Sequence, residues 1–118
     1  MVKQAVIPLA GLGTRMLPLT KVLPKELWPL GTQSILEHIL DECFAAGVKQ
    51  VIFVISKNKN VIKKYFTKNK ILEKVVKKKP DIFKKLIYLN RISSKIKFVY
   101  QDKPRGLGHA VMCAERYI

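Results

Sequence analysis

The sequence predicts an α/β domain in which about three parallel strands are flanked by helices. Two mostly apolar segments with β-branched residues, at residues 2–9 and 50–56, and an alternating segment at residues 95–100 have the length of strands, and the segments between them contain apolar residues at helical spacing. The chain has 118 residues, of which 48% are hydrophobic, so it can form a core of its own. We therefore expect one folded domain.

The first strand is predicted at residues 2–9, and a long loop is predicted at residues 10–31. The strand is a mostly apolar run, which is typical of a strand buried on both faces. The loop contains three prolines and three glycines, so regular structure is not expected within it. Ordered loops of this length usually carry a function.

A helix is predicted to begin after Ser34, because Ser34 and Glu37 have the spacing of a capping box. Its apolar positions recur every three to four residues as far as Phe44, and Gly47 supplies a stop signal. The strand at residues 50–56 follows after a short link. A strand, a helix and a strand in this order predict a parallel pair with a right-handed crossover.

The remaining segments are predicted in order along the chain. The basic block at residues 57–97 has helical spacing in two pieces, which Pro80 divides. The strand at residues 95–100 alternates between apolar and polar side chains, a turn covers residues 102–108, and a last helix is expected at residues 109–117.

Most of the net charge lies in the basic block. Of the 23 Lys and Arg residues, fifteen fall within residues 57–97 together with two acidic ones, so the block accounts for +13 of the formal charge of +15. A polyanion-binding module is therefore one open interpretation. Nearly all of these cations are Lys, which is a poor substitute for Arg in bidentate phosphate recognition, so we expect no nucleic-acid partner.

The cysteines and the apolar segments indicate a reduced, cytoplasmic environment. Cys43 and Cys113 lie far apart and outside any metal-binding spacing, so neither a disulfide framework nor a zinc site is expected. No apolar stretch approaches the length of a membrane span, so we expect no membrane partner.

The loop after the first strand has the character of a phosphate-binding segment. It reads AGLGTR at residues 10–15 and continues as LPLTKVLPKELWPL at residues 17–30. Glycines allow backbone N–H groups to approach phosphate oxygens, and Arg15 and Lys25 add positive charge. Met16 excludes both the G-x-G-x-x-G dinucleotide fingerprint and the Walker A loop, because each requires glycine at that position.

These residues resemble the signature of the sugar-1-phosphate nucleotidyltransferases, and residues 17–30 look like the bacterial UTP–glucose-1-phosphate uridylyltransferase version. Tyr100-Gln101 followed by GLGHA at residues 106–110 resembles the uracil-recognising segment of the same family. The resemblance implies a Rossmann-like, GT-A-like three-layer sandwich. Residues 1–118 would form the N-terminal part of a single nucleotidyltransferase domain, with a basic helical insertion at about residues 57–94.

The resemblance also implies a reaction, in which UTP and glucose 1-phosphate give UDP-glucose and diphosphate. The backbone of Ala10 and Gly11 would hold the uracil and ribose. Gln101 would present its amide to the uracil edge, and Gly106 would leave room for the base.

A second group of residues would bind the phosphates. The resemblance implies that Gly13, Thr14 and Arg15 cradle the triphosphate and that Arg15 stabilises the diphosphate leaving group. Lys25 would neutralise the α-phosphate and the incoming sugar phosphate, and Glu26 would contact the nucleoside or order Lys25.

The resemblance further implies Mg²⁺, whose ligands the family places beyond Ile118, so no residue of this chain is assigned to the metal. We expect the chain to be catalytically incomplete alone, and to need a complementing C-terminal segment or a homo-oligomer that covers the apolar edge of the first strand. Two alternatives stay open beside the enzyme: a non-catalytic nucleotide-binding regulatory or partner subunit, and the polyanion-binding module.

Overall fold

A parallel sheet of three strands forms the centre of the molecule. The computed structural model describes residues 3–11, 13–102 and 105–118. The strand order is β1 (Gln4–Pro8), β4 (Gln50–Ile55), β5 (Ile96–Tyr100), and both pairings are parallel. The predicted parallel sheet is confirmed, although Val2, at the start of the predicted first strand, lies outside the described residues.

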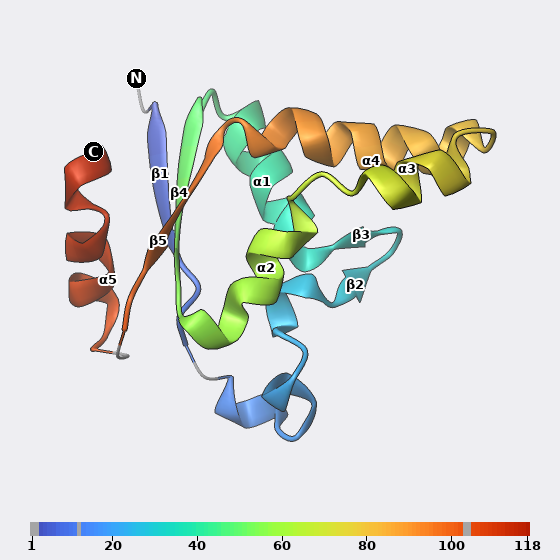
Figure 1. The fold of residues 1–118 in the computed structure, drawn as a ribbon. Coiled ribbons are helices and arrows are strands. Elements are labelled where there is room, and N and C mark those ends of the chain that lie inside the picture. Colours follow the sequence, from blue (N-terminus) through green and yellow to red (C-terminus); the bar gives the residue numbers. More distant parts are fainter. Residues whose placement is uncertain (1–2, 12, 103–104) are drawn as a thin grey trace.

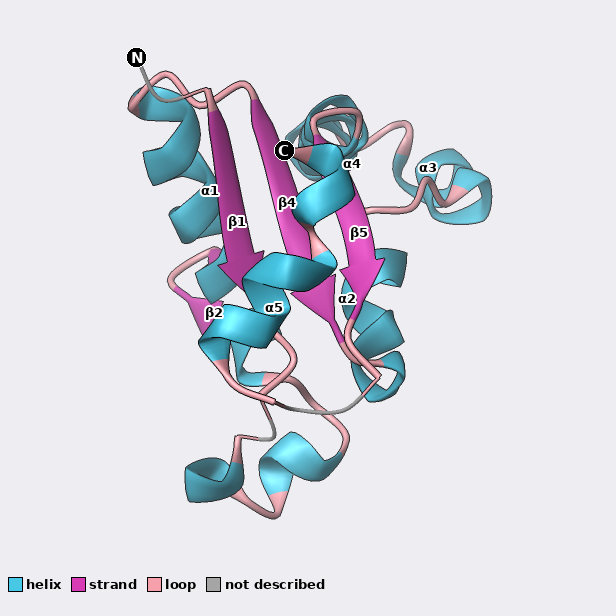
Figure 2. Cartoon of the chain, turned by 90° about the vertical axis from the view of Figure 1, so that its left-hand side faces the viewer, coloured by secondary structure: helices cyan, strands magenta, loops and turns pink. Residues whose placement is uncertain are grey.

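Helices cover both faces of this sheet, so the molecule has three layers (Figures 1 and 2). One layer contains α1 (Ile35–Ala45), α2 (Asn60–Tyr65) and α4 (Pro80–Ser93), and the other contains α5 (Leu107–Cys113). The central strand β4 is buried on both sides: Phe53 packs with the α1 side, and Ile52 packs with Ala110 of α5. This double burial explains why the strand is an unbroken apolar run.

The predicted capping box opens α1 as expected. The Glu37 backbone N–H donates to Ser34 Oγ at 3.2 Å, and the Ser34 backbone N–H donates to Glu37 Oε1 at 3.3 Å. At the other end, Gly47 has a φ of +94°, a value that side chains disfavour. Both the start and the stop of this helix are therefore confirmed.

The loop at residues 10–31 has more regular structure than the sequence predicts. It contains three single turns of 3₁₀ helix, η1 (Thr14–Met16), η2 (Leu19–Lys21) and η3 (Lys25–Leu27). Strand β2 (Pro29–Leu30) then pairs antiparallel with β3 (Gln33–Ser34). Two-residue strands have no periodicity to detect, and Gly31 supplies the turn between them with a φ of +73°.

The basic block contains three helices, so the prediction of two helical pieces is wrong. Between α2 and α4 lies α3 (Lys70–Val76), whose apolar residues Ile71, Leu72, Val75 and Val76 have helical spacing although none of them is buried. An N-cap residue marks the start of α3: Asn69 Oδ1 accepts a hydrogen bond from the Leu72 backbone N–H at 3.1 Å. Pro80 is the first residue of α4, the position that proline favours.

The last helix also differs from its predicted bounds. Helix α5 starts at Leu107, two residues earlier than expected, and after Cys113 the chain continues as a 3₁₀ turn, η5 (Glu115–Tyr117). Part of the predicted turn at residues 102–108, residues 103–104, lies outside the described residues.

Candidate functional site

The carboxyl ends of the three parallel strands lie at one edge of the sheet (Figure 2), and the loop after β1 and Gln101 after β5 follow the strands there. Two backbone bonds connect the segments that leave the strands. The Leu9 N–H donates to the Val54 carbonyl at 2.7 Å, and the Gln101 N–H donates to the Ile55 carbonyl at 2.8 Å. These two hydrogen bonds to β4 therefore fix the position of Gln101 and of the start of the loop at residues 10–27.

A cleft of about 270 Å³, the Gln101 cleft, opens at this edge. Four of the predicted site residues line it, and they come from opposite ends of the chain: Ala10, Gly11, Gln101 and Gly106. Its lining is completed by Pro8, Leu107 and Ala110. The two motifs found in the sequence thus contribute to one site.

Gln101 is held firmly in this cleft. Gln101 is only 4% exposed, and its side-chain Nε2 lies 2.7 Å from His109 Nδ1. In this orientation of the amide, Nε2 donates and Nδ1 accepts, which corresponds to the imidazole tautomer with its proton on Nε2. Gly106, the residue before α5, has a φ of +87°, a conformation that favours glycine.

A second cleft of about 280 Å³, the Lys59 cleft, adjoins the first and shares Gly11 with it. Its lining comprises Gly11, Thr14, Leu17, Thr20, Lys21, Val22, Pro24, Ser56, Asn58 and Lys59. Of the predicted phosphate-binding residues, Thr14 lies here. Lys21 and Lys59 add two cations to which the sequence analysis gave no role.

The loop between the clefts is shaped by Gly13 and presents its cations to solvent. Gly13 has a φ of +64°, and its carbonyl accepts from Thr20 Oγ1 at 2.6 Å. Arg15 on η1 and Lys25 on η3 are exposed and line neither cleft. Neither forms an ion pair with another described residue, so both cations are available to an anion.

Glu26 is buried and forms an ion pair with Lys59. Their side chains are 7% and 13% exposed, and Lys59 Nζ lies 2.7 Å from Glu26 Oε1. The sequence analysis connected Glu26 with the nucleoside or with Lys25, whereas the structure pairs it with Lys59. The other oxygen, Oε2, is buried without a hydrogen-bond partner among the described residues.

Lys59 could have been found from its position. It follows strand β4 in the sequence SKNK, and residues after the carboxyl ends of parallel strands face the same site as those after β1. The lysines around it hid this signal, because nothing in the sequence separates one lysine of the block from the rest.

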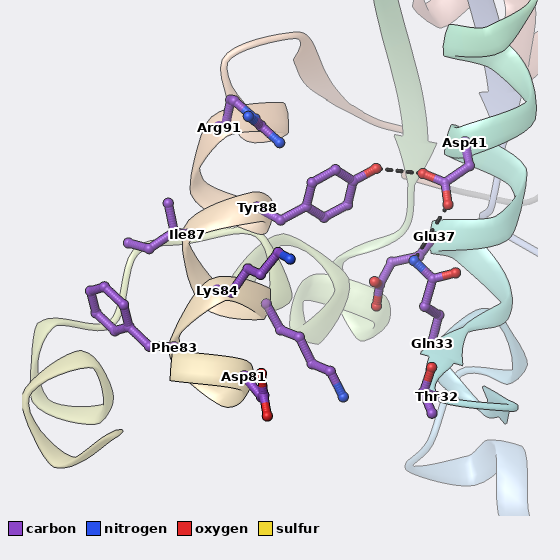
Figure 3. A pocket seen from close by; sticks show the side chains of 11 residues that line it. Thr32, Gln33, Glu37, Asp41, Asp81, Phe83, Lys84, Ile87, Tyr88 and Arg91 are labelled. Atoms are coloured by element: carbon purple, nitrogen blue, oxygen red, sulfur yellow. Dashed lines mark hydrogen bonds between the residues drawn. The ribbon is translucent and has the colours of Figure 1, made fainter. Parts of the chain in front are cut away.

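A larger hollow than either cleft, of about 880 Å³, lies elsewhere, between α1 and α4 (Figure 3). Tyr88 reaches from α4 and donates to Asp41, and Tyr65 on α2 donates to Glu37. Burial, reinforced by these carboxylate acceptors, raises the pKa of both tyrosines to about 12. The hollow contains none of the motif residues, and we interpret it as the seam along which α4 packs on α1.

The described residues do not provide a magnesium site. Within residues 3–11, 13–102 and 105–118, no group of three or more His, Cys, Asp or Glu side chains is arranged to hold a metal ion. The same part of the chain contains no helix that is both long enough and apolar enough to cross a membrane.

A parallel sheet covered on both faces, with a glycine-rich loop and an amide-bearing cleft at its carboxyl edge, is typical of nucleotide-binding α/β proteins. Residues 4–118 match the family model described as Nucleotidyl transferase, and the chain belongs to this family. The predicted family and fold class are thereby confirmed.

Individual members of the family show which of its proteins this chain is similar to. The chain is similar to UTP--glucose-1-phosphate uridylyltransferases of Staphylococcus epidermidis, at 40% identity, and of Bacillus subtilis, at 38%, over 99% of its own length and 41% and 40% of theirs. Two solved structures, a UDP-glucose pyrophosphorylase and a UTP-bound UGPase from Acinetobacter baumannii, superpose with TM-scores of 0.90 and 0.91. Each is 39% identical, with 99% of this chain and 42% of that chain covered. The chain thus spans about two fifths of these relatives.

Proposed function

We propose that the chain is the UTP-binding part of an enzyme that converts UTP and glucose 1-phosphate to UDP-glucose and diphosphate. The observation that carries the proposal is the convergence of Ala10, Gly11, Gln101 and Gly106 on one cleft. The relatives that match 99% of the chain are named for this reaction, and one of the solved relatives is described as UTP-bound.

In this proposal the Gln101 cleft holds the nucleoside. Backbone groups of Ala10 and Gly11 bind the uracil and ribose, and the Gln101 amide reads the uracil edge. Gly106 keeps the space beside the base open, since its α-carbon carries no side chain. The unpartnered Oε2 of Glu26 accepts a hydrogen bond from the nucleoside, which would satisfy a buried atom that has no other partner.

The loop around η1 and η3 binds the phosphates. A phosphate oxygen of glucose 1-phosphate attacks the α-phosphorus of UTP, and the bond to the β-phosphate breaks so that diphosphate leaves with the bonding electrons. Two anions approach each other, so positioning and positive charge dominate the catalysis. Gly13 and Thr14 cradle the triphosphate, Arg15 stabilises the leaving diphosphate, and Lys25 neutralises the reacting phosphates.

The proposal includes a partner for the free edge of β1. In the described residues β1 pairs only with β4, and its side chains are mostly half-buried while those of β4 are buried. A strand from a C-terminal segment or from a second copy would pair with this edge. The magnesium ion implied by the family enters no step here, because the described residues do not fit one. Two free cysteines are compatible with a cytoplasmic location.

Nucleotide binding is tested by titrating the full chain with UTP in saturation-transfer NMR. We expect Arg15→Ala and Gln101→Ala each to raise the Kd about tenfold, the equivalent of roughly 1.4 kcal/mol for a lost hydrogen-bonded contact. Arg91→Ala on α4 and Gln33→Ala on β3 are the matched controls, since both lie outside the two clefts.

Two results would count against the proposal: absence of UTP binding by the unmodified chain, and binding that neither site substitution weakens. Diphosphate release from UTP and glucose 1-phosphate then separates the enzyme from a non-catalytic nucleotide-binding subunit, which would bind UTP without turnover.

A further inference from the structure

We propose that His109 is a positioning residue that makes the Gln101 cleft select uracil over cytosine, by holding the Gln101 amide in one of its two orientations. The inference rests on the proposed function, because it concerns the base of the bound nucleotide. It adds a residue that does not line the Gln101 cleft itself.

The geometry leaves the Gln101 side chain little freedom. Its backbone N–H is bound to the Ile55 carbonyl at 2.8 Å, the residue is 4% exposed, and Nε2 lies 2.7 Å from His109 Nδ1. His109 is itself carried by α5, next to Ala110, which is 1% exposed and packs against β4. The acceptor for the amide nitrogen is therefore fixed to the sheet through the helix.

The Nε2–Nδ1 bond assigns a different task to each end of the amide. With the nitrogen occupied by His109, the oxygen Oε1 is the end left to accept, and no hydrogen bond among the described residues reaches it. A flipped amide would place Oε1 against Nδ1, which suits only the imidazole tautomer with its proton on Nδ1. The imidazole tautomer and the amide orientation are therefore coupled, and the tautomer with its proton on Nε2 goes with the orientation in which Oε1 is left to accept.

The two pyrimidines differ at the position that this oxygen would meet. Uracil has an N–H at N3, which donates, whereas cytosine has a bare nitrogen at N3, which accepts. An amide oxygen at that place bonds to uracil and leaves two acceptors facing each other with cytosine. Sites that hydrogen-bond a substrate reject an analogue mainly because buried polar groups are left unpaired.

The test compares the Kd values of UTP and CTP for the full chain, by isothermal titration. We expect His109→Leu to reduce the preference for UTP about tenfold or more, because the amide can then turn to suit either base. His109→Asn should keep the preference within about threefold, since Asn Oδ1 can accept in place of Nδ1. His38→Leu on α1 is the matched control, remote from the cleft, and should change nothing.

A second measurement does not depend on any variant. Long-range ¹⁵N–¹H spectra of the imidazole report the tautomer, and we expect Nδ1 of His109 to be unprotonated in the UTP complex. A protonated Nδ1 would overturn the inference, and so would an undiminished UTP preference in His109→Leu. Failure of His109→Asn to restore a preference lost in His109→Leu would reduce His109 to a packing role. Absence of UTP binding by the unmodified chain would instead refute the proposed function, and this inference with it.

Discussion

The loop at residues 10–27 and the basic block at residues 57–97 differ most in where their charge lies. The block carries fifteen basic side chains, yet its cations other than Lys59 lie on exposed surfaces of α2, α3, α4 and β5 or their links. The loop has three, Arg15, Lys21 and Lys25, and it crosses the carboxyl edge of the sheet. Position relative to the strand ends, rather than the amount of charge, distinguishes the cations to which the proposed function assigns a role.

Lys59 is the exception that joins the two regions. It belongs to the block by sequence, but it is the one described lysine whose residue is not exposed, and it lines the cleft that contains Thr14. Its partner Glu26 comes from the loop, so the ion pair connects the chain after β1 to the chain after β4. Removing this ion pair therefore gives the largest expected difference between Lys59 and the other lysines of the basic block.

We expect Lys59→Met to destabilise the protein by about 3 kcal/mol, because it leaves the buried carboxylate of Glu26 without its cation. Chemical unfolding in urea measures the loss. Lys57→Met, two residues earlier and exposed, should change stability by less than about 0.5 kcal/mol.

The double variant Lys59→Met/Glu26→Gln identifies the cause of that loss. Neutralising Glu26 removes the unpaired charge, so most of the stability should return. If the double variant is as unstable as Lys59→Met, the effect comes from lost packing of the lysine chain, and the loop is not held by the ion pair.

The two glycines of the loop, Gly11 and Gly13, are expected to differ in what they contribute to stability and to binding. Gly13→Ala should cost about 1–2 kcal/mol, because the residue has a φ of +64° and an added Cβ would lie 3.2 Å from Thr20 Cγ2. Gly11→Ala meets nothing within 4 Å and should leave stability nearly unchanged. Gly11 lines both clefts, however, so its variant should weaken UTP binding. Thermal melts and UTP titrations of both variants separate loop shape from ligand contact, and equal stabilities would contradict the assignment.

The fold could be predicted where apolar periodicity and capping chemistry agree. The central strand β4 and helix α1 have both signals, and the structure confirms them. Helix α3 was missed although Ile71, Leu72, Val75 and Val76 have helical spacing, and none of these residues is buried, so the helix does not contribute to the core. The hairpin of β2 and β3 was missed because two-residue strands leave no pattern to detect.

The candidate site divides in the same way. Motif residues that line a common cleft, such as Gly11 and Gln101, could be predicted because their types and spacing follow the family signature. The ion pair of Lys59 joins segments that are distant in sequence, and the hydrogen bond of His109 crosses the turn between β5 and α5. Only the tertiary structure shows these two contacts.

Removal of a hydrogen bond between the basic block and α1 is expected to have the smallest effect on stability. Tyr88 of α4 donates to Asp41 of α1, so Tyr88→Phe should cost about 1 kcal/mol at pH 8, the typical value of one hydrogen bond. Tyr117→Phe, whose hydroxyl makes no hydrogen bond to a described residue, is the control and should cost less.

The pH dependence of Tyr88→Phe has a definite sign. Burial and the Asp41 acceptor raise the pKa of Tyr88 from 10.0 to about 12, so the folded state holds the phenol proton more tightly than the unfolded state. Its contribution to stability is complete below pH 10 and is lost as the pH rises through about 12. The stability difference between the wild type and Tyr88→Phe should therefore shrink over this window, when unfolding is followed at successive pH values. A difference that stays constant from pH 8 to pH 12 would show that the hydroxyl does not hold α4 against α1, and that the apolar contacts of the block suffice.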